Sequence, residues 1–72
     1  MQPENIKAAT KGMSYDNAVS YIQSLPLELS LIRDMKIERL WRVENNPIID
    51  YITVSYNSLV TGKAHVGIIT KY

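Results

Sequence analysis

Hydrophobic and polar residues alternate along the middle of the chain, over residues 35–44 and again over residues 48–56. A period of two is typical of β-strands that have one face in the core and the other in solvent. We expect the apolar members of both runs to share the dry face. They are Met35, Ile37, Trp41, Val43, Ile48, Ile52, Val54 and Tyr56.

The residues between the two runs predict a tight turn. Asn45 and Asn46 tolerate the positive φ that a two-residue hairpin turn requires. The register that pairs Glu44 with Pro47 keeps the apolar residues on one face, whereas a slip of one residue would mix the two faces. The sequence therefore predicts a hairpin over residues 35–56.

Two charged residues interrupt the apolar face of this hairpin. In the expected register Arg39 lies opposite Ile52 and Asp50 lies opposite Trp41, so the two charges are diagonal neighbours. We expect them to form a partly solvated ion pair at the edge or rim of the sheet. A carboxylate activated by burial is the alternative for Asp50, and a bulge near residues 48–50 would instead turn it outward.

Residues 14–25 predict one amphipathic helix. Ser14 is a good N-cap residue, and Pro26 ends the helix because it cannot continue the hydrogen-bond ladder. The apolar residues fall at helical spacing in a single stripe, which consists of Tyr15, Ala18, Val19, Ile22 and Leu25. We expect this stripe to pack on the sheet, because a small sheet needs a cover to be stable.

The segments on either side of this helix are less regular. Residues 1–12 are polar and lack a clear period, so we expect a flexible N-terminal arm with a short turn at residues 6–9. Residues 27–34 alternate as in a strand that leads into residue 35, and they fit a helical turn nearly as well. We favour the strand.

The chain after the hairpin predicts a connection and a last strand. Residues 57–63 contain the turn residues Thr61 and Gly62, and residues 64–72 alternate again. One side of this strand carries Ala64, Val66, Ile68 and Tyr72, and the other carries His65, Gly67, Ile69 and Lys71. Gly67 marks a bulge or the close approach of another backbone.

Together these elements predict an α+β fold in two layers, in which one N-terminal helix packs on an antiparallel meander of three to four strands. We expect residues 1–12 to be the arm and residues 13–72 to be a single small domain. The helix would cover the face that carries Ile37, Trp41, Val43, Ile52, Val54, Val66 and Ile68.

Composition narrows the class of protein. The chain has 72 residues, of which 46% are hydrophobic and 21% charged, as in a folded single domain with a modest core. A net charge of +1 gives no general attraction to nucleic acid or to an anionic membrane. The absence of cysteine excludes disulfides and thiolate metal sites, and no apolar run is long enough to span a bilayer. We therefore expect a complete, cytoplasmic protein with no membrane partner.

Residues suited to catalysis are sparse. His65 is the single histidine, so a metal centre or a nucleophile backed by a base has few residues to draw on. The three glycines, Gly12, Gly62 and Gly67, form no phosphate-binding motif. The seven acidic residues do not cluster along the chain. We expect no enzymatic activity, no metal and no cofactor.

The face of the sheet opposite the helix is the candidate binding site. It combines apolar side chains with a basic rim, and such patches on small proteins usually mark an interface. Tyrosine and arginine also anchor many interfaces. The expected partner-binding residues are Lys36, Leu40, Arg42, Ile49, Tyr51, Ile69 and Lys71.

Three interpretations of this face remain open. In the first, the chain is a non-enzymatic inhibitor or adaptor, of the kind that phages or plasmids encode, and it binds a protein or a second copy of itself through the face or through an unpaired edge at residues 48–56 or 66–72. In the second, Tyr51 stacks on nucleic acid while Lys36, Arg42 and Lys71 contact phosphates. In the third, a fourth strand or the arm covers the patch.

Overall fold

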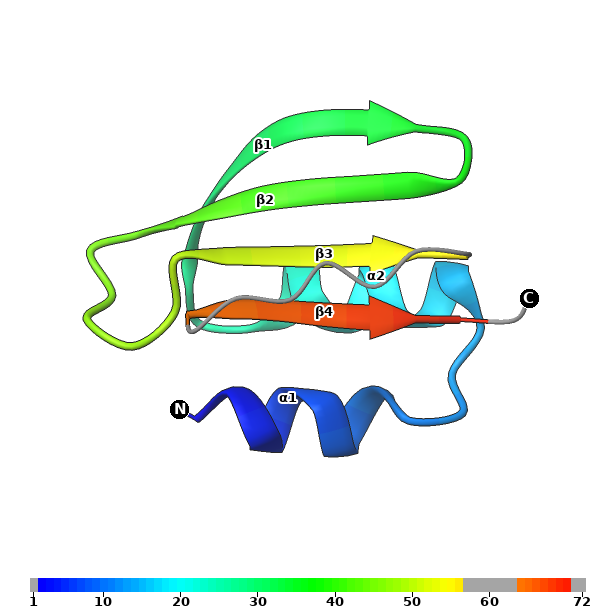
Figure 1. Ribbon diagram of the computed structural model, residues 1–72, viewed down its shortest axis with the longest axis horizontal. Helices are drawn as coiled ribbons and strands as arrows, with labels where there is room; N and C mark the ends of the chain where they lie inside the picture. The colour runs from blue at the N-terminus through cyan, green and yellow to red at the C-terminus, as the bar shows by residue number, and fades with distance from the viewer. Residues whose placement is uncertain (1, 57–63, 71–72) are drawn as a thin grey trace.

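The computed structural model describes residues 2–56 and 64–70. These residues form two helices and then a four-stranded sheet in the order β1-β2-β3-β4 (Figure 1). The elements are α1 (Pro3–Thr10), α2 (Tyr15–Ser24), β1 (Glu28–Met35), β2 (Glu38–Glu44), β3 (Tyr51–Ser55) and β4 (His65–Ile69). The predicted α+β class, with a helix packed on a mostly antiparallel sheet, is confirmed.

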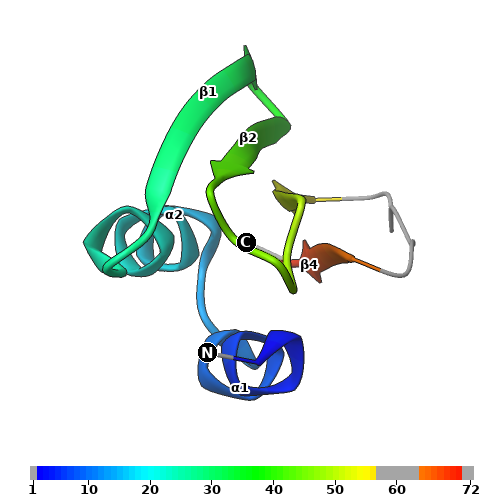
Figure 2. The ribbon, with the colours of Figure 1, turned by 90° about the vertical axis from the view of Figure 1, so that its left-hand side faces the viewer.

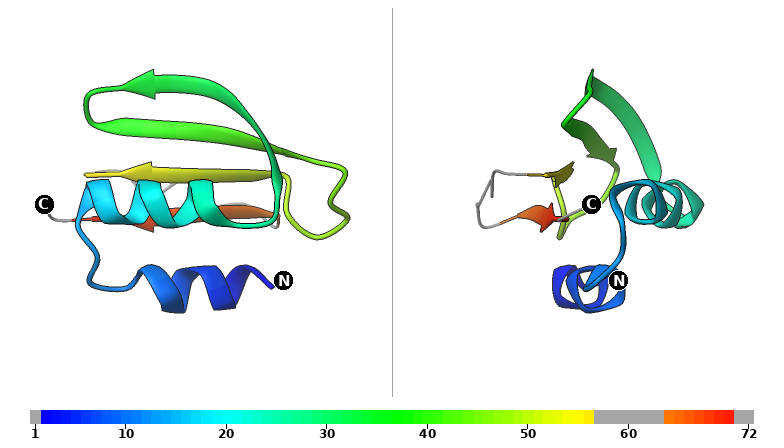
Figure 3. Two further views of the ribbon diagram at one scale, coloured as in Figure 1. Left: turned by 180° about the vertical axis from the view of Figure 1, so that it is seen from behind. Right: turned by 90° about the vertical axis from the view of Figure 1, so that its right-hand side faces the viewer.

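Both helices lie on one side of the sheet, and they cover only part of it. Seen from behind, α2 lies over β3 and β4 and runs nearly along them, and α1 lies along the edge of β4 (Figure 3). The β1–β2 hairpin curves away from both helices towards its tip (Figure 2). The core therefore sits under β3, β4 and one end of β2.

Helix α2 forms where the sequence predicts it. The Ser14 side chain accepts a hydrogen bond from the Asn17 backbone N–H at 3.2 Å, which satisfies one of the free donors of the first turn. The predicted stripe faces the core, with Tyr15, Ala18, Val19 and Ile22 buried and Leu25 partly buried.

The first residues of the chain differ from the expected flexible arm, because Pro3–Thr10 is helical. Proline is favoured in the first turn, where its missing N–H removes no helical hydrogen bond. Ile6 is fully buried, and the Thr10 hydroxyl donates a 2.8 Å hydrogen bond to the Ile6 carbonyl. Gly12, with a φ of 82°, then lets the chain reverse direction into α2.

The hairpin predicted over residues 35–56 is shorter, because it consists of β2 and β3, and β2 also forms a hairpin with the preceding strand. Residues 27–34 are a strand, as favoured, but β1 ends at Met35 and β2 begins at Glu38, which lies opposite Met35. Lys36 and Ile37 form the turn between them. Met35 and Ile37, expected on the dry face, are therefore exposed at the hairpin tip.

The pairing of β2 with β3 keeps the expected faces in a shifted register. Tyr51 lies opposite Arg42 instead of Leu40, a shift of two residues. Because an even shift leaves each side chain on its own side, Trp41 is buried as predicted, although it lies opposite Ile52 instead of Asp50. Arg39 consequently lies opposite Val54.

The shift arises in the turn, which takes residues 45–50 and not two residues. Asn45 has a φ of 53°, as expected of asparagine in a turn. The Asn46 side-chain oxygen accepts hydrogen bonds from the backbone N–H groups of Ile48 at 2.8 Å and Ile49 at 2.9 Å. This turn reverses the two isoleucines relative to the prediction, since Ile49 is 0% exposed and Ile48 is 39% exposed.

The expected ion pair between Arg39 and Asp50 is absent. Arg39 Nε instead lies 3.1 Å from Asp34 Oδ1 on β1. Asp50 is exposed, and its backbone joins the strands, because its N–H donates to the Ala64 carbonyl and its carbonyl accepts from the Val43 N–H. The prediction of this pair was wrong because it rested on the unshifted register.

The last strand differs from the expected antiparallel meander. β4 pairs with β3 in the parallel direction, with Ile52 opposite Val66 and Val54 opposite Ile68. Val66 and Ile68 are buried, as predicted. The predicted turn at Thr61 and Gly62, like Lys71 and Tyr72 at the end, lies outside the described residues.

The shortened side chains Ile49→Val and Ile48→Val test this arrangement. We expect Ile49→Val to lower the free energy of unfolding by about 0.5–1.5 kcal/mol, because it removes a methyl group from a packed core. Ile48→Val is the matched control and should stay within about 0.5 kcal/mol of the parent. Urea unfolding measures both values, and equal losses or the reverse order would contradict the turn described here.

Candidate interaction surface

The structure brings part of the predicted site together on the sheet face that lies away from the helices. Alternation along the strands places Leu40, Arg42, Tyr51 and Ile69 there. The prediction for Ile49 was wrong, because this side chain is buried in the core and does not lie on the outward face. Lys36 lies in the β1–β2 turn, at one corner of the sheet. Lys71 lies outside the described residues.

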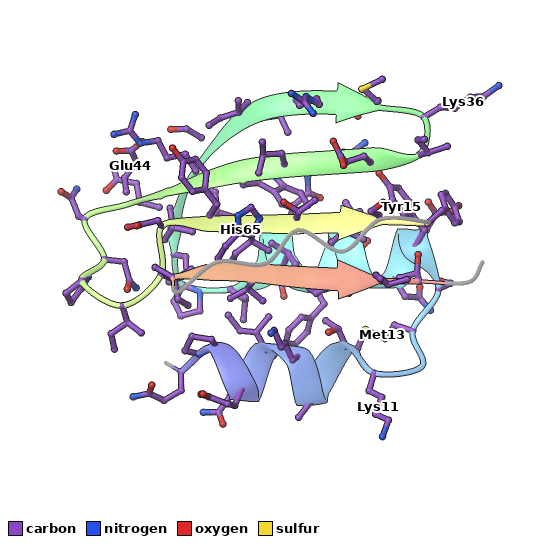
Figure 4. All side chains as sticks on the ribbon, in the orientation of Figure 1. Lys11, Met13, Tyr15, Lys36, Glu44 and His65 are labelled. Carbon is purple, nitrogen blue, oxygen red and sulfur yellow. The ribbon has the colours of Figure 1, made fainter. Side chains whose placement is uncertain are left out.

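Arg42, Tyr51 and His65 form one row across this outward face, on β2, β3 and β4. The Tyr51 and His65 rings stack with their centroids 5.7 Å apart and their planes at 30°. Figure 4 shows His65 between β3 and β4. The row joins a cation to two stacked rings, which is a surface on which a planar group can lie.

The His65 side chain is held by Thr53. The Thr53 hydroxyl lies 2.7 Å from His65 Nε2. Burial lowers the pKa of His65, because a partly buried imidazolium loses hydration. A hydroxyl beside an imidazole is also the arrangement of a nucleophile and its base. Thr53 is buried, however, so its hydroxyl offers little access to a substrate.

A polar hollow of about 390 Å³ lies beside this row, at the β2–β3 turn. Its lining is Arg42, Val43, Glu44, Asn45, Asn46, Asp50 and Tyr51. Arg42 Nε lies 3.5 Å from Glu44 Oε1, so the one guanidinium in the lining already has an anionic neighbour. The hollow therefore presents mixed charge and amide groups, with little net charge.

Within the described residues, half of the large apolar side chains that are exposed lie elsewhere, on the β1–β2 hairpin. Four large apolar side chains there are between 46% and 54% exposed, namely Leu31, Ile32, Met35 and Ile37. The hairpin curves away from the helices, so neither helix covers its tip (Figure 2). Leu31 pairs with Trp41 and Met35 with Glu38, so alternation places these two side chains on opposite faces of the hairpin. All four lie within residues 31–37, and a concentration of exposed apolar side chains marks interaction sites on small domains. We call these four residues the hairpin patch.

The hairpin patch is fixed in place by polar contacts. Arg33 pairs with Glu38 at 3.0 Å across the hairpin, and the Tyr56 N–H donates a 3.1 Å hydrogen bond to the Ile37 carbonyl. The second contact ties the hairpin tip to the end of β3. Each exposed ion pair contributes less than about 1 kcal/mol, but together these contacts restrain the hairpin.

An aromatic pair lies beside the tip of the same hairpin. The Tyr15 and Tyr56 rings stack with centroids 4.6 Å apart, close to the Arg39 side chain. Burial raises the pKa of Tyr15, and the positive charge of Arg39 partly opposes that rise. The Tyr15 hydroxyl has no hydrogen-bond partner within the described part of the chain.

Sequence analysis missed the hairpin patch because Met35 and Ile37 fit the alternation of a core strand. One signal could have indicated it. Leu31 and Ile32 are adjacent apolar residues in a strand, and a sheet covered on one face cannot bury both. The structure has a bulge there, since Leu31 pairs with Trp41 and Arg33 with Leu40, which leaves Ile32 as the extra residue.

Comparison with known proteins gives no family for this chain. No family model, no curated protein and no solved structure matches it. Over residues 2–56 and 64–70, no three histidine, aspartate or glutamate side chains gather as metal ligands. In the same residues, neither helix has the length and apolar character needed to cross a membrane.

The lowered pKa of His65 predicts a pH-dependent stability. The unfolded imidazole binds a proton near pH 6.5 while the folded one resists it. The free energy of unfolding should therefore fall as the pH drops below 6.5, until the folded pKa is passed. Urea unfolding between about pH 7.5 and about pH 5 measures this loss.

His65→Gln is the control for that measurement. It keeps a hydrogen-bonding side chain and removes the titration, so its loss of stability over the same range should be smaller than that of the parent. Both chains share the carboxylates, and their difference isolates His65. Equal losses in the two chains would show that His65 titrates normally in the fold.

Proposed function

We propose that this chain is a non-enzymatic interaction protein, an inhibitor or adaptor, that binds a larger protein through the β1–β2 hairpin. The observation that supports the proposal is the hairpin patch, whose four apolar side chains are about half exposed on the part of the β1–β2 pair that neither described helix covers. Covering the exposed half of one such side chain contributes on the order of 1 kcal/mol. Four of them supply a useful fraction of a binding free energy.

The surroundings of the hairpin patch favour specific binding. Arg33, Asp34 and Lys36 are exposed and lie between the apolar residues along the chain. Charged groups beside apolar ones contribute specificity to an interface. The ion pairs and the hydrogen bond at the tip restrain the hairpin, which lowers the conformational entropy lost when a partner docks.

The hairpin patch supports protein binding better than the outward face does. On that face Ile69 is 48% exposed, but its neighbours in the ladder are Ser55 and Glu38. Leu40 is only partly exposed and lies opposite the buried Thr53. Ile69 is therefore surrounded by polar neighbours in the ladder, whereas the hairpin carries four exposed apolar side chains within residues 31–37.

The double variant Leu31→Thr, Met35→Thr tests the proposal. Threonine keeps the strand propensity and removes most of the apolar surface. We expect the tagged parent to retain a specific protein from its host lysate and the double variant to lose it. Ile69→Thr is a matched control of similar exposure and should retain that protein. Affinity capture with mass spectrometry measures this, and loss with Ile69→Thr alone would place the site on the outward face.

A second candidate function is the binding of single-stranded nucleic acid on the outward face. The row of Arg42, Tyr51 and His65 favours it, because bases stack on aromatic rings and guanidinium groups bind phosphate. The net charge of +1 and the nearby Glu44 oppose it. This candidate predicts a different set of sensitive residues.

Fluorescence anisotropy with a labelled mixed-sequence oligonucleotide at low salt tests this candidate. If the row binds bases, Tyr51→Ala should weaken binding by about 1–3 kcal/mol. The double variant Leu31→Thr, Met35→Thr should bind as the parent does. No binding by the parent at low salt, where electrostatic attraction is strongest, would exclude the candidate.

A further inference from the structure

Among residues 2–56 and 64–70, one of the two edges of the sheet is open along its whole length. At the β4 edge, helix α1 lies beside the five-residue strand. At the other edge, the eight residues of β1 have no strand or helix on their outer side among the described residues (Figure 1). A strand edge of this kind presents unpaired N–H and C=O groups to another strand.

The side chains of β1 are apolar at its centre and charged towards its ends. Leu31 and Ile32 lie at the bulge in the middle of the strand, and both are about half exposed. Glu28 lies at one end, and Arg33 and Asp34 lie near the other. A two-fold axis brings the same strand of a second copy against this edge in the antiparallel direction.

We propose that two copies of this chain associate by antiparallel pairing of their β1 edges, with Leu31 and Ile32 at the two-fold axis. This proposal goes beyond the proposed function, because it assigns the outer edge of the same hairpin to a second copy instead of a larger protein. The pairing joins the two four-stranded sheets into one. It uses the full length of β1, and it covers the central apolar residues of both copies.

The bulge and the charges select this register. Because Ile32 is the extra residue of the bulge, Leu31 and Ile32 together occupy one position of the ladder. Centring the pair there sets Ser30 opposite the second copy's Arg33, so Glu28 becomes a diagonal neighbour of that guanidinium. The two-fold symmetry repeats this contact, so the interface contains two Glu28–Arg33 attractions. If the pairing shifted by one ladder position towards the hairpin tip, Arg33 would lie opposite Arg33 of the second copy. Repulsion between the two like charges disfavours that register.

The net charge of each copy and the size of the interface determine the expected affinity of the dimer. A net charge of +1 on each copy gives little repulsion between them. One pair of eight-residue strands buries less area than a standard interface of about 1,600 Å². We therefore expect a dimer that dissociates on dilution. Sedimentation velocity from about 1 µM to about 1 mM covers the affinities of such interfaces.

Charge reversal tests the register. Glu28→Arg or Arg33→Glu alone should weaken the dimer about tenfold, because each replaces two cross-copy attractions with repulsions. The double variant Glu28→Arg, Arg33→Glu should restore it. Ile69→Lys is the control at the opposite edge and should dimerise as the parent does. Circular dichroism checks that each variant keeps its fold, and Leu31→Thr provides a second disrupting variant that leaves both charges in place.

The outcomes separate this inference from the proposed function. A concentration-dependent dimer that the single reversals weaken and the double variant restores supports the β1 pairing. A monomer at every concentration overturns it, and so does a dimer that only Ile69→Lys disrupts. A monomer that still captures a host protein through Leu31 and Met35 overturns the second copy as partner and leaves the proposed function standing. A monomer that captures nothing overturns both.

Discussion

The structure depends on how much of the sheet its two helices can cover. Helix α2 supplies Ala18, Val19 and Ile22 to the core, and α1 supplies little more than Ile6. These side chains cover β3, β4 and the Trp41 end of β2, and nothing among the described residues covers the tip of the β1–β2 hairpin (Figure 3). The buried half of the sheet stabilises the fold, and the other half carries the exposed apolar surface.

The hairpin is consequently held by contacts that are weak one at a time. The Arg33–Glu38 and Asp34–Arg39 pairs are exposed to solvent, and the hydrogen bond from the Tyr56 N–H to the Ile37 carbonyl lies at the tip. Segments with few buried contacts open at a lower free energy than the core does. A partner that binds only the closed hairpin would therefore stabilise it by mass action. Binding and local order are coupled in this part of the chain.

The sequence predicted those parts of the fold that depend on local periodicity. The stripe of α2 has a helical spacing, and the face of Trp41, Ile52 and Val54 survives the register shift because that shift is even. Helix α1 was missed because Ile6 and Thr10 are its only buried residues, too few to show a period. The direction of β4 could not be predicted, since alternation is the same in parallel and antiparallel strands.

Part of the candidate site could likewise be predicted from local periodicity, and part could not. The shared outward face of Arg42 and Tyr51 follows from alternation and was predicted, whereas the burial of Ile49 depends on how the Asn46 side chain caps the turn. The hairpin patch depends on a turn at Lys36 and Ile37, which contains none of the usual turn residues. An alternating strand buries its apolar face only where another element packs on that face. Whether an element does so depends on the whole fold and cannot be read from the strand alone.

An exposed apolar edge strand can bind a partner, but it can also cause aggregation. The sequence of β1 allows binding and limits aggregation. Bulges and charges are the devices that keep natural edges from pairing at random. Here the bulge at Ile32 interrupts the ladder, and Arg33 and Asp34 follow directly after it. An uncharged flat strand would accept a partner in many registers. The charges of β1 disfavour the register that sets Arg33 against itself, and they leave an apolar centre with opposite charges on either side. The features that protect this edge from aggregation are therefore the same ones that would give its binding a definite register.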